Sequence, residues 1–85
     1  MRRFNIDCRR LTDRTAAHEY LKEVFKFPEY YGKNLDALYD CLFEIPSCTI
    51  RLKNAWAITQ LGDYGMAMLK TFVDAANERE DIELV

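Results

Sequence analysis

Two aspartates, Asp36 and Asp40, stand four residues apart in the segment from Phe27 to Leu42. In a helix this spacing places both carboxylates on one face, where like charges mildly destabilise the helix. The helix itself gains nothing from the pair, so we expect it to serve a group outside the helix. Such carboxylates can accept hydrogen bonds from cationic groups of a partner or, inside a cleft that shields one of them, exchange protons with a substrate.

The residues around the two aspartates predict a helix that begins at Leu35. Pro28 disfavours a helical Phe27, so a preceding helix should end there, and Gly32 permits a tight or left-handed turn. Asn34 is a good N-cap for the helix that follows. The core-facing stripe of this helix is predicted to be Leu35, Leu38, Cys41, Leu42 and Ile45, with Asp36, Asp40 and Phe43 on the opposite face and Tyr39 at the boundary.

Other segments predict three short strands, at residues 3–8, 48–52 and 82–85, from β-prone or alternating residues. Thr15 is the predicted N-cap of a first long helix that ends before Pro28. Asn54 is predicted to cap a brief helix over 55–61, and Gly62, Asp63 and Gly65 are predicted to form a turn. A final helix from residue 66 is predicted to bury Met66, Leu69, Val73 and Ala76, which leaves Asp74 outside the apolar stripe.

The order of these elements predicts an α/β fold, because strands separated by helices favour a parallel sheet. The 85 residues suffice for one small domain, 1–85, and its helices must supply much of the core. The order of the three strands does not follow from the pattern. Trp56 and Phe72 are predicted to lie in this core.

Composition excludes several functional classes. The net charge of −2 argues against nonspecific nucleic-acid binding, which needs a basic surface. The start of the chain lacks the apolar stretch of a signal peptide, and no apolar run approaches membrane-spanning length, so we expect a cytoplasmic protein without membrane contact. Cys8, Cys41 and Cys48 are expected to be reduced thiols. With His18 as the single histidine, predicted at the surface or its boundary, we expect neither a metal site nor a cofactor.

The run PEYYGKNLDALYDCL, residues 28–42, resembles the barstar family of intracellular ribonuclease inhibitors. The likeness continues at lower density to the end of the chain and implies a three-stranded parallel sheet covered by about four helices. It also implies that a helix and its preceding loop plug the active site of a basic, barnase-like secreted ribonuclease. Asp40 would then stand where a substrate phosphate sits, with Asp36 facing a basic residue of the partner. The partner-binding residues implied or inferred in this way are Tyr30, Gly32, Asn34, Leu35, Asp36, Tyr39, Asp40, Phe43 and Asp74.

The residues assigned to partner binding also have purely structural explanations. Asp36 and Asp40 could simply form a solvated helix face, and Asp36 in the first turn is also stabilised by the helix dipole. Phe43 is either a single exposed aromatic or an interface anchor. Tyr31 is assigned to packing and Tyr30 to the partner.

The acidic helix face and the family resemblance lead to three hypotheses about function. The leading one is ribonuclease inhibition. The second is a regulatory module that presents the same acidic face to another basic protein. The third, an enzyme using Asp36 and Asp40, has little support because two aspartates on a convex helix offer no cleft.

Overall fold

A three-stranded parallel sheet organises the structure, a computed structural model that describes residues 2–85. Its strands are β1 (Arg2–Asp7), β2 (Cys48–Lys53) and β3 (Ile82–Leu84). They lie in the order β1-β2-β3, so β2 is central and Ile50 pairs with Phe4 on one side and Leu84 on the other. The predicted α/β class with a parallel three-stranded sheet is confirmed, and the structure supplies the strand order.

One face of the sheet is buried and the other is uncovered. Successive side chains of a strand point to opposite faces, so apolar and polar residues alternate. The buried face carries Phe4, Ile6, Cys48, Ile50 and Ile82, whereas Arg3, Asn5, Arg51 and Glu83 on the opposite face are exposed. The helices therefore pack on a single side of the sheet.

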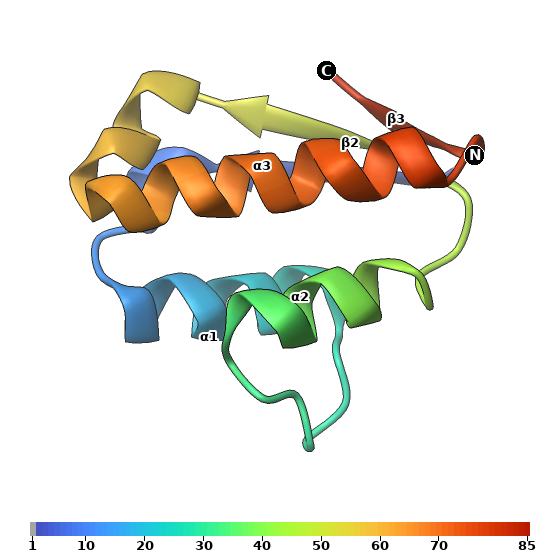
Figure 1. The fold of residues 1–85 in the computed structure, drawn as a ribbon, viewed down its shortest axis with the longest axis horizontal. Coiled ribbons are helices and arrows are strands. Elements are labelled where there is room, and N and C mark those ends of the chain that lie inside the picture. Colours follow the sequence, from blue (N-terminus) through green and yellow to red (C-terminus); the bar gives the residue numbers. More distant parts are fainter. Residues whose placement is uncertain (1) are drawn as a thin grey trace.

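Three α-helices form this second layer: α1 (Arg14–Phe25), α2 (Leu35–Leu42) and α3 (Asp63–Glu78). Two 3₁₀ helices, η1 (Cys8–Arg10) and η2 (Ala55–Leu61), follow the first two strands. α1 packs on β1, where the rings of Phe25 and Phe4 have centroids 4.8 Å apart, α3 packs on β3, and α2 packs against α3. In Figure 1 the loop joining α1 to α2 projects from the end of the molecule opposite the sheet. This arrangement exposes that loop and one side of α2.

Asp13, and not Thr15, caps α1. The Asp13 carboxylate accepts a hydrogen bond of 2.8 Å from the backbone N–H of Ala16, and Thr15 is already a helical residue. Both residue types make good N-caps, and the aspartate one turn before Ala17 takes the position. For α2 the predicted cap is confirmed: the side-chain oxygen of Asn34 accepts a 2.7 Å bond from the N–H of Ala37.

The predicted start and buried face of the last helix were wrong. α3 begins at Asp63, so Gly65 is a buried helical residue and no turn residue. A Cβ at Gly65 would collide with the carbonyl oxygen of Ile58, and the glycine thus permits close packing of α3 on η2. The core-facing side chains are Met68, Thr71, Phe72 and Ala75. Of the four residues predicted to be buried, Leu69 and Ala76 are half-buried against the core, whereas Met66 and Val73 are exposed.

Thr71 explains part of that error. Its hydroxyl donates a hydrogen bond of 2.8 Å to the carbonyl oxygen of Ala67, and this bond allows the threonine to be buried. Hydropathy alone assigns threonine to the surface. Phe72 is in the core as predicted, but Trp56 is 70% exposed, which contradicts its predicted core position.

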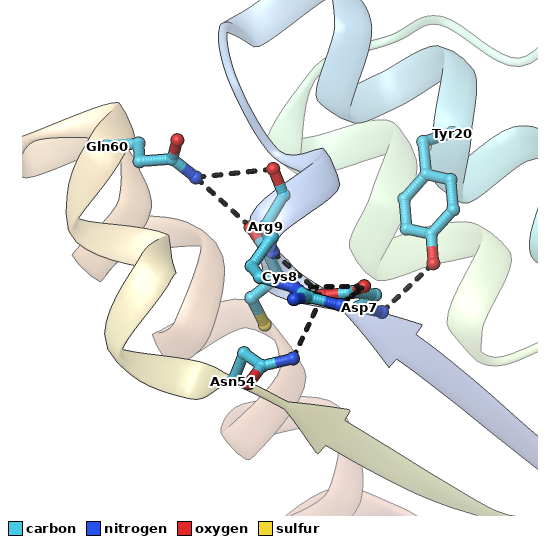
Figure 2. Close-up of polar contacts among 6 residues, drawn as sticks. All are labelled: Asp7, Cys8, Arg9, Tyr20, Asn54 and Gln60. Atoms are coloured by element: carbon cyan, nitrogen blue, oxygen red, sulfur yellow. Dashed lines mark hydrogen bonds and ion pairs between the residues drawn. The ribbon is translucent and has the colours of Figure 1, made fainter.

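The carboxyl end of β1 is held by a group of polar contacts around Asp7 (Figure 2). The Asp7 carboxylate accepts hydrogen bonds from the guanidinium of Arg9, at 2.9–3.3 Å, and from the amide of Asn54, at 3.2 Å. The backbone N–H of Asp7 donates a hydrogen bond of 2.9 Å to the hydroxyl of Tyr20 on α1. Asn54 thus precedes η2 as predicted, but its side chain joins η2 to β1 and makes no capping bond.

Candidate protein-binding site

The loop between α1 and α2 is anchored by two aromatic side chains. Phe27 is 7% exposed and Tyr31 is 5% exposed, and their ring centroids are 4.8 Å apart. The N–H of Tyr31 donates 3.0 Å to the carbonyl oxygen of Pro28, which closes a turn. Tyr30, between the two anchors, is 80% exposed. The structure therefore turns Tyr31 inward and Tyr30 outward, the arrangement predicted for these adjacent tyrosines.

His18 was predicted at the surface or its boundary, and this prediction was wrong. Its ring is 1% exposed, with Nδ1 2.7 Å from the hydroxyl of Tyr31 and Nε2 2.6 Å from the hydroxyl of Tyr64. Burial lowers the pKa of His18 and favours the neutral ring, in which one nitrogen donates and the other accepts. This histidine links α1 to the loop before α2 and to the first turn of α3.

Lys33, and not Gly32, takes the left-handed conformation in this loop, with φ of 54°. The expectation that Gly32 supplies this geometry was wrong. A Cβ on Gly32 would instead come within 3.3 Å of the Cβ of Ala37 and the side-chain nitrogen of Asn34. Space, more than backbone freedom, is what the glycine provides.

The outer face of α2 carries the two aspartates singled out from the sequence. Asp36 and Asp40 are both exposed, and neither carboxylate forms an ion pair or accepts a hydrogen bond from any residue between 2 and 85. Tyr39, half-buried, packs edge-on against Phe43, with ring centroids 4.9 Å apart, and Phe43 is 39% exposed. Two free carboxylates thus lie beside an ordered aromatic pair.

The inner face of α2 holds it against the body of the protein. Leu38, Cys41 and Leu42 are buried as predicted, and Leu35 is half-buried at the start of the helix. Ile45 is also buried, but it lies beyond the end of α2 at Leu42. Asn34 is exposed. Besides capping α2, its side-chain amide donates a hydrogen bond of 3.3 Å to the carbonyl oxygen of Gly32. Leu35 and Asn34 therefore support the site from the side of the fold.

Asp74 lies on α3, which packs against α2. Its carboxylate accepts a 2.8 Å bond from Nζ of Lys70, one turn earlier on the helix. The bond to Asp74 raises the pKa of Lys70, and the neighbouring Tyr39 of α2 contributes in the same direction. Asp74 is thus close to the α2 face, but its charge is balanced by Lys70, unlike those of Asp36 and Asp40.

Glu44 belongs to the same surface, although it is not among the site residues predicted from the sequence. It follows Asp40 by four residues, the spacing that already joined Asp36 to Asp40, and it is exposed. Together with Tyr30, Gly32 and Asp40 it borders a hollow of about 270 Å³. We call the exposed residues Tyr30, Gly32, Asp36, Asp40, Phe43 and Glu44, together with the half-buried Tyr39, the acidic surface.

A second hollow, of about 350 Å³, lies on the other flank of α2. Its lining includes Arg14, Lys33, Asp36 and Tyr64, so two cations adjoin one end of the acidic surface. Sequence patterns gave no signal for this hollow, because α1, the loop and α3 each contribute to it.

Neither a membrane span nor a metal cluster is found in the described part of the chain. No helix within residues 2–85 has the length and apolar character to cross a membrane. Within the same residues, His, Cys, Asp and Glu side chains form no group of three or more that could hold a metal ion.

Comparisons with known proteins identify the family of the chain. The family model described as "Barstar (barnase inhibitor)" matches residues 1–85. A protein of Bacillus subtilis (strain 168) named "Putative ribonuclease inhibitor YrdF" is 40% identical over 85 aligned residues, which cover 95% of this chain and 92% of the relative. Both the family resemblance and the fold inferred from the sequence are confirmed: the chain belongs to the barstar family.

Proposed function

We propose that this chain inhibits a small basic ribonuclease by inserting its acidic surface into the substrate groove. The observation that carries the proposal is the pair Asp36 and Asp40, exposed on one face of α2 without an ionic partner among residues 2–85. Unpaired carboxylates in a fixed arrangement are suited to accept charge-assisted hydrogen bonds from arginine, lysine or histidine. Membership in this family supports a function as an inhibitor and argues against a function as an enzyme.

In this proposal Asp40 occupies the position of a substrate phosphate and Asp36 faces a neighbouring cation. Tyr30 and Phe43 supply apolar contact on either side, since exposed aromatics beside charges are common anchors of protein interfaces. A negative surface that approaches a positive groove also accelerates the encounter of the two proteins. RNA is then excluded because its phosphates and the two aspartates compete for the same cations.

We place this inhibition inside the cell, before the ribonuclease is exported. The three buried thiols, Cys8, Cys41 and Cys48, support that location because free cysteines persist in a reducing compartment.

Titration of the protein against small basic bacterial ribonucleases, barnase among them, while RNA cleavage is followed, tests the proposal. Asp40→Asn should weaken inhibition by about 30-fold or more, the loss typical of an interface hot spot. The matched control is Glu83→Gln, which removes one carboxylate from the uncovered face of the sheet and should leave inhibition unchanged.

Equal inhibition by Asp40→Asn and the wild type would remove Asp40 from its assigned role. If the wild-type protein inhibits none of the ribonucleases in the series, the proposed function is overturned. A regulatory partner for the acidic surface is then favoured.

A further inference from the structure

We propose that Arg14 recognises a carboxylate on the ribonuclease partner, at the hollow beside the first turn of α2. This inference rests on the proposed function and extends it, because it adds a cationic contact to an otherwise acidic surface. The occupant to which we commit is the side chain of one aspartate or glutamate at the edge of the partner's basic groove.

The position of Arg14 is defined by a short series of contacts that starts in the core. His18 is 1% exposed, and its Nε2 lies 2.6 Å from the hydroxyl of Tyr64. The Tyr64 ring in turn supports the Arg14 guanidinium, whose central carbon lies 4.1 Å from the ring centroid. Stacking of this kind restricts the orientation of the guanidinium before any partner arrives.

Stacking uses the face of the guanidinium and leaves its N–H groups available in the plane. Within residues 2–85 Arg14 forms no ion pair and donates no side-chain hydrogen bond. A planar fork of free donors matches a carboxylate, which can accept two parallel bonds from it. Arg14 therefore offers an ordered, unoccupied recognition group next to α2.

The charges around the hollow favour an anion in that place. Arg14 and Lys33 both line it, against one carboxylate, that of Asp36. Lys33 is 3.5 Å from Glu19, and both of these side chains are largely exposed, so this ion pair is weak. The hollow therefore carries an excess of positive charge at the end of the acidic surface.

The acidic surface decides which kind of anion fits. A polyanion such as RNA would be repelled by Asp36, Asp40 and Glu44 as it reached the hollow. A basic protein with a single acidic side chain beside its groove satisfies both regions at once. A ribonuclease without that acidic side chain would leave Arg14 desolvated and unpaired, so the contact also discriminates between related ribonucleases.

The chain contains a matched control. Arg10 stacks on Tyr20 with its guanidinium carbon 4.7 Å from the ring centroid, but it does not line the hollow. Arg14→Ala and Arg10→Ala each remove one cation and one cation–π contact. They should therefore lower the melting temperature by similar amounts.

The experiment measures inhibition of a bacterial ribonuclease that the wild-type protein inhibits, with barnase as the first probe. Arg14→Ala should weaken inhibition by about tenfold or more, the loss expected for a charge-assisted bond, and Arg10→Ala should not. Arg14→Lys should recover only part of the loss, because lysine keeps the charge without the planar fork.

A second arm replaces the acidic residues around the ribonuclease groove by alanine, one at a time. One of these replacements should weaken inhibition by about tenfold with the wild-type inhibitor and have no further effect with Arg14→Ala. That coupling identifies the recognised carboxylate and would not arise from a purely structural role of Arg14.

Equal inhibition by Arg14→Ala and Arg10→Ala would overturn the inference while the proposed function stands. The same holds if no acidic residue of the ribonuclease couples to Arg14. Absence of inhibition by the wild-type protein would overturn the proposed function first, and this inference with it.

Discussion

The guanidinium of Arg79, just after α3, donates a 2.9 Å hydrogen bond to the carbonyl oxygen of Leu42, the last residue of α2. The same nitrogen donates 2.7 Å to the carbonyl oxygen of Ile45. Carbonyl groups at the end of a helix, such as that of Leu42, lack partners within the helix. This carbonyl group and that of Ile45, in the segment after α2, accept their bonds from a side chain 34–37 residues further along the chain. The helix that carries Asp36 and Asp40 is thus fastened at its C-terminal end by Arg79, as it is at its N-terminal end by Asn34.

Arg79→Ala should therefore destabilise the protein by about 2–4 kcal/mol, because it leaves two partly buried carbonyl groups without donors. Its side chain is only 14% exposed, which limits the access of water to replace it. Urea unfolding measures the loss, and Arg3→Ala on the uncovered face of the sheet is the control that should change stability by less than about 0.5 kcal/mol. A similar small effect for Arg79→Ala would show that water satisfies both carbonyl groups.

Stability should fall in acid as Asp81 becomes protonated. Hydrogen bonds from Arg79, and secondarily from Ser47, lower the pKa of Asp81 from its ordinary 3.8 to about 2. Because the folded-state pKa is the lower one, the stabilisation is complete above pH 4 and is lost as pH falls from about 4 to about 2.

The urea midpoint of Asp81→Asn should accordingly depend less on pH between 4 and 2 than that of the wild type. Glu80→Gln removes the adjacent carboxylate, whereas the Arg79 guanidinium binds that of Asp81, and this variant should keep the wild-type acid dependence. Parallel acid curves for Asp81→Asn and wild type would contradict this assignment.

The two helix caps offer a direct separation of stability from binding. Asn34→Ala and Asp13→Ala each remove one side-chain bond to a helix N–H, at 2.7 and 2.8 Å, and each should cost about 1 kcal/mol. Asn34→Ala should in addition weaken inhibition by about three- to tenfold. The reason is that the Asn34 side chain also orders the loop before α2, through its hydrogen bond to the carbonyl oxygen of Gly32.

Asp13→Ala is the stability-matched control, and both cap variants are compared in the Arg14→Ala background because Asp13 caps the turn that carries Arg14. In that background Asp13→Ala should not weaken inhibition further, whereas Asn34→Ala should. Equal inhibition by both variants in the ribonuclease titration would mean that the cap of α2 does not prepare the acidic surface.

Local sequence signals predicted the region around α2 well. Pro28 and Asn34 act on their immediate neighbours, so the end of α1, the start of α2 and its buried stripe could be read without tertiary information. The alternation of β1 and the apolar residues of β2 likewise reflect a sheet with one buried face. The spacing alone left Asp36 and Asp40 open between a solvated face and a binding site, and their assignment to binding stays a prediction that rests on the family resemblance.

The errors arose where distant segments meet. His18 looks polar in sequence, and its burial depends on hydroxyl groups 13 and 46 residues away. The rotation of α3 depends on the close approach of Gly65 to η2, which no helical periodicity contains. Arg14 is part of a hollow only because Tyr64, far along the chain, lies beneath it. Long-range packing, and not local propensity, decided each of these cases.

The distribution of the three buried cysteines gives the protein an internal set of chemical reporters. Cys8 begins η1, Cys41 lies in α2 and Cys48 begins β2, and burial raises the pKa of each thiol. An alkylating reagent can modify them only when the segment around each one opens, since the thiolate is the reactive form and needs access. The order in which the three sites gain mass would therefore rank the local openings of the molecule, with Cys41 recording that of α2.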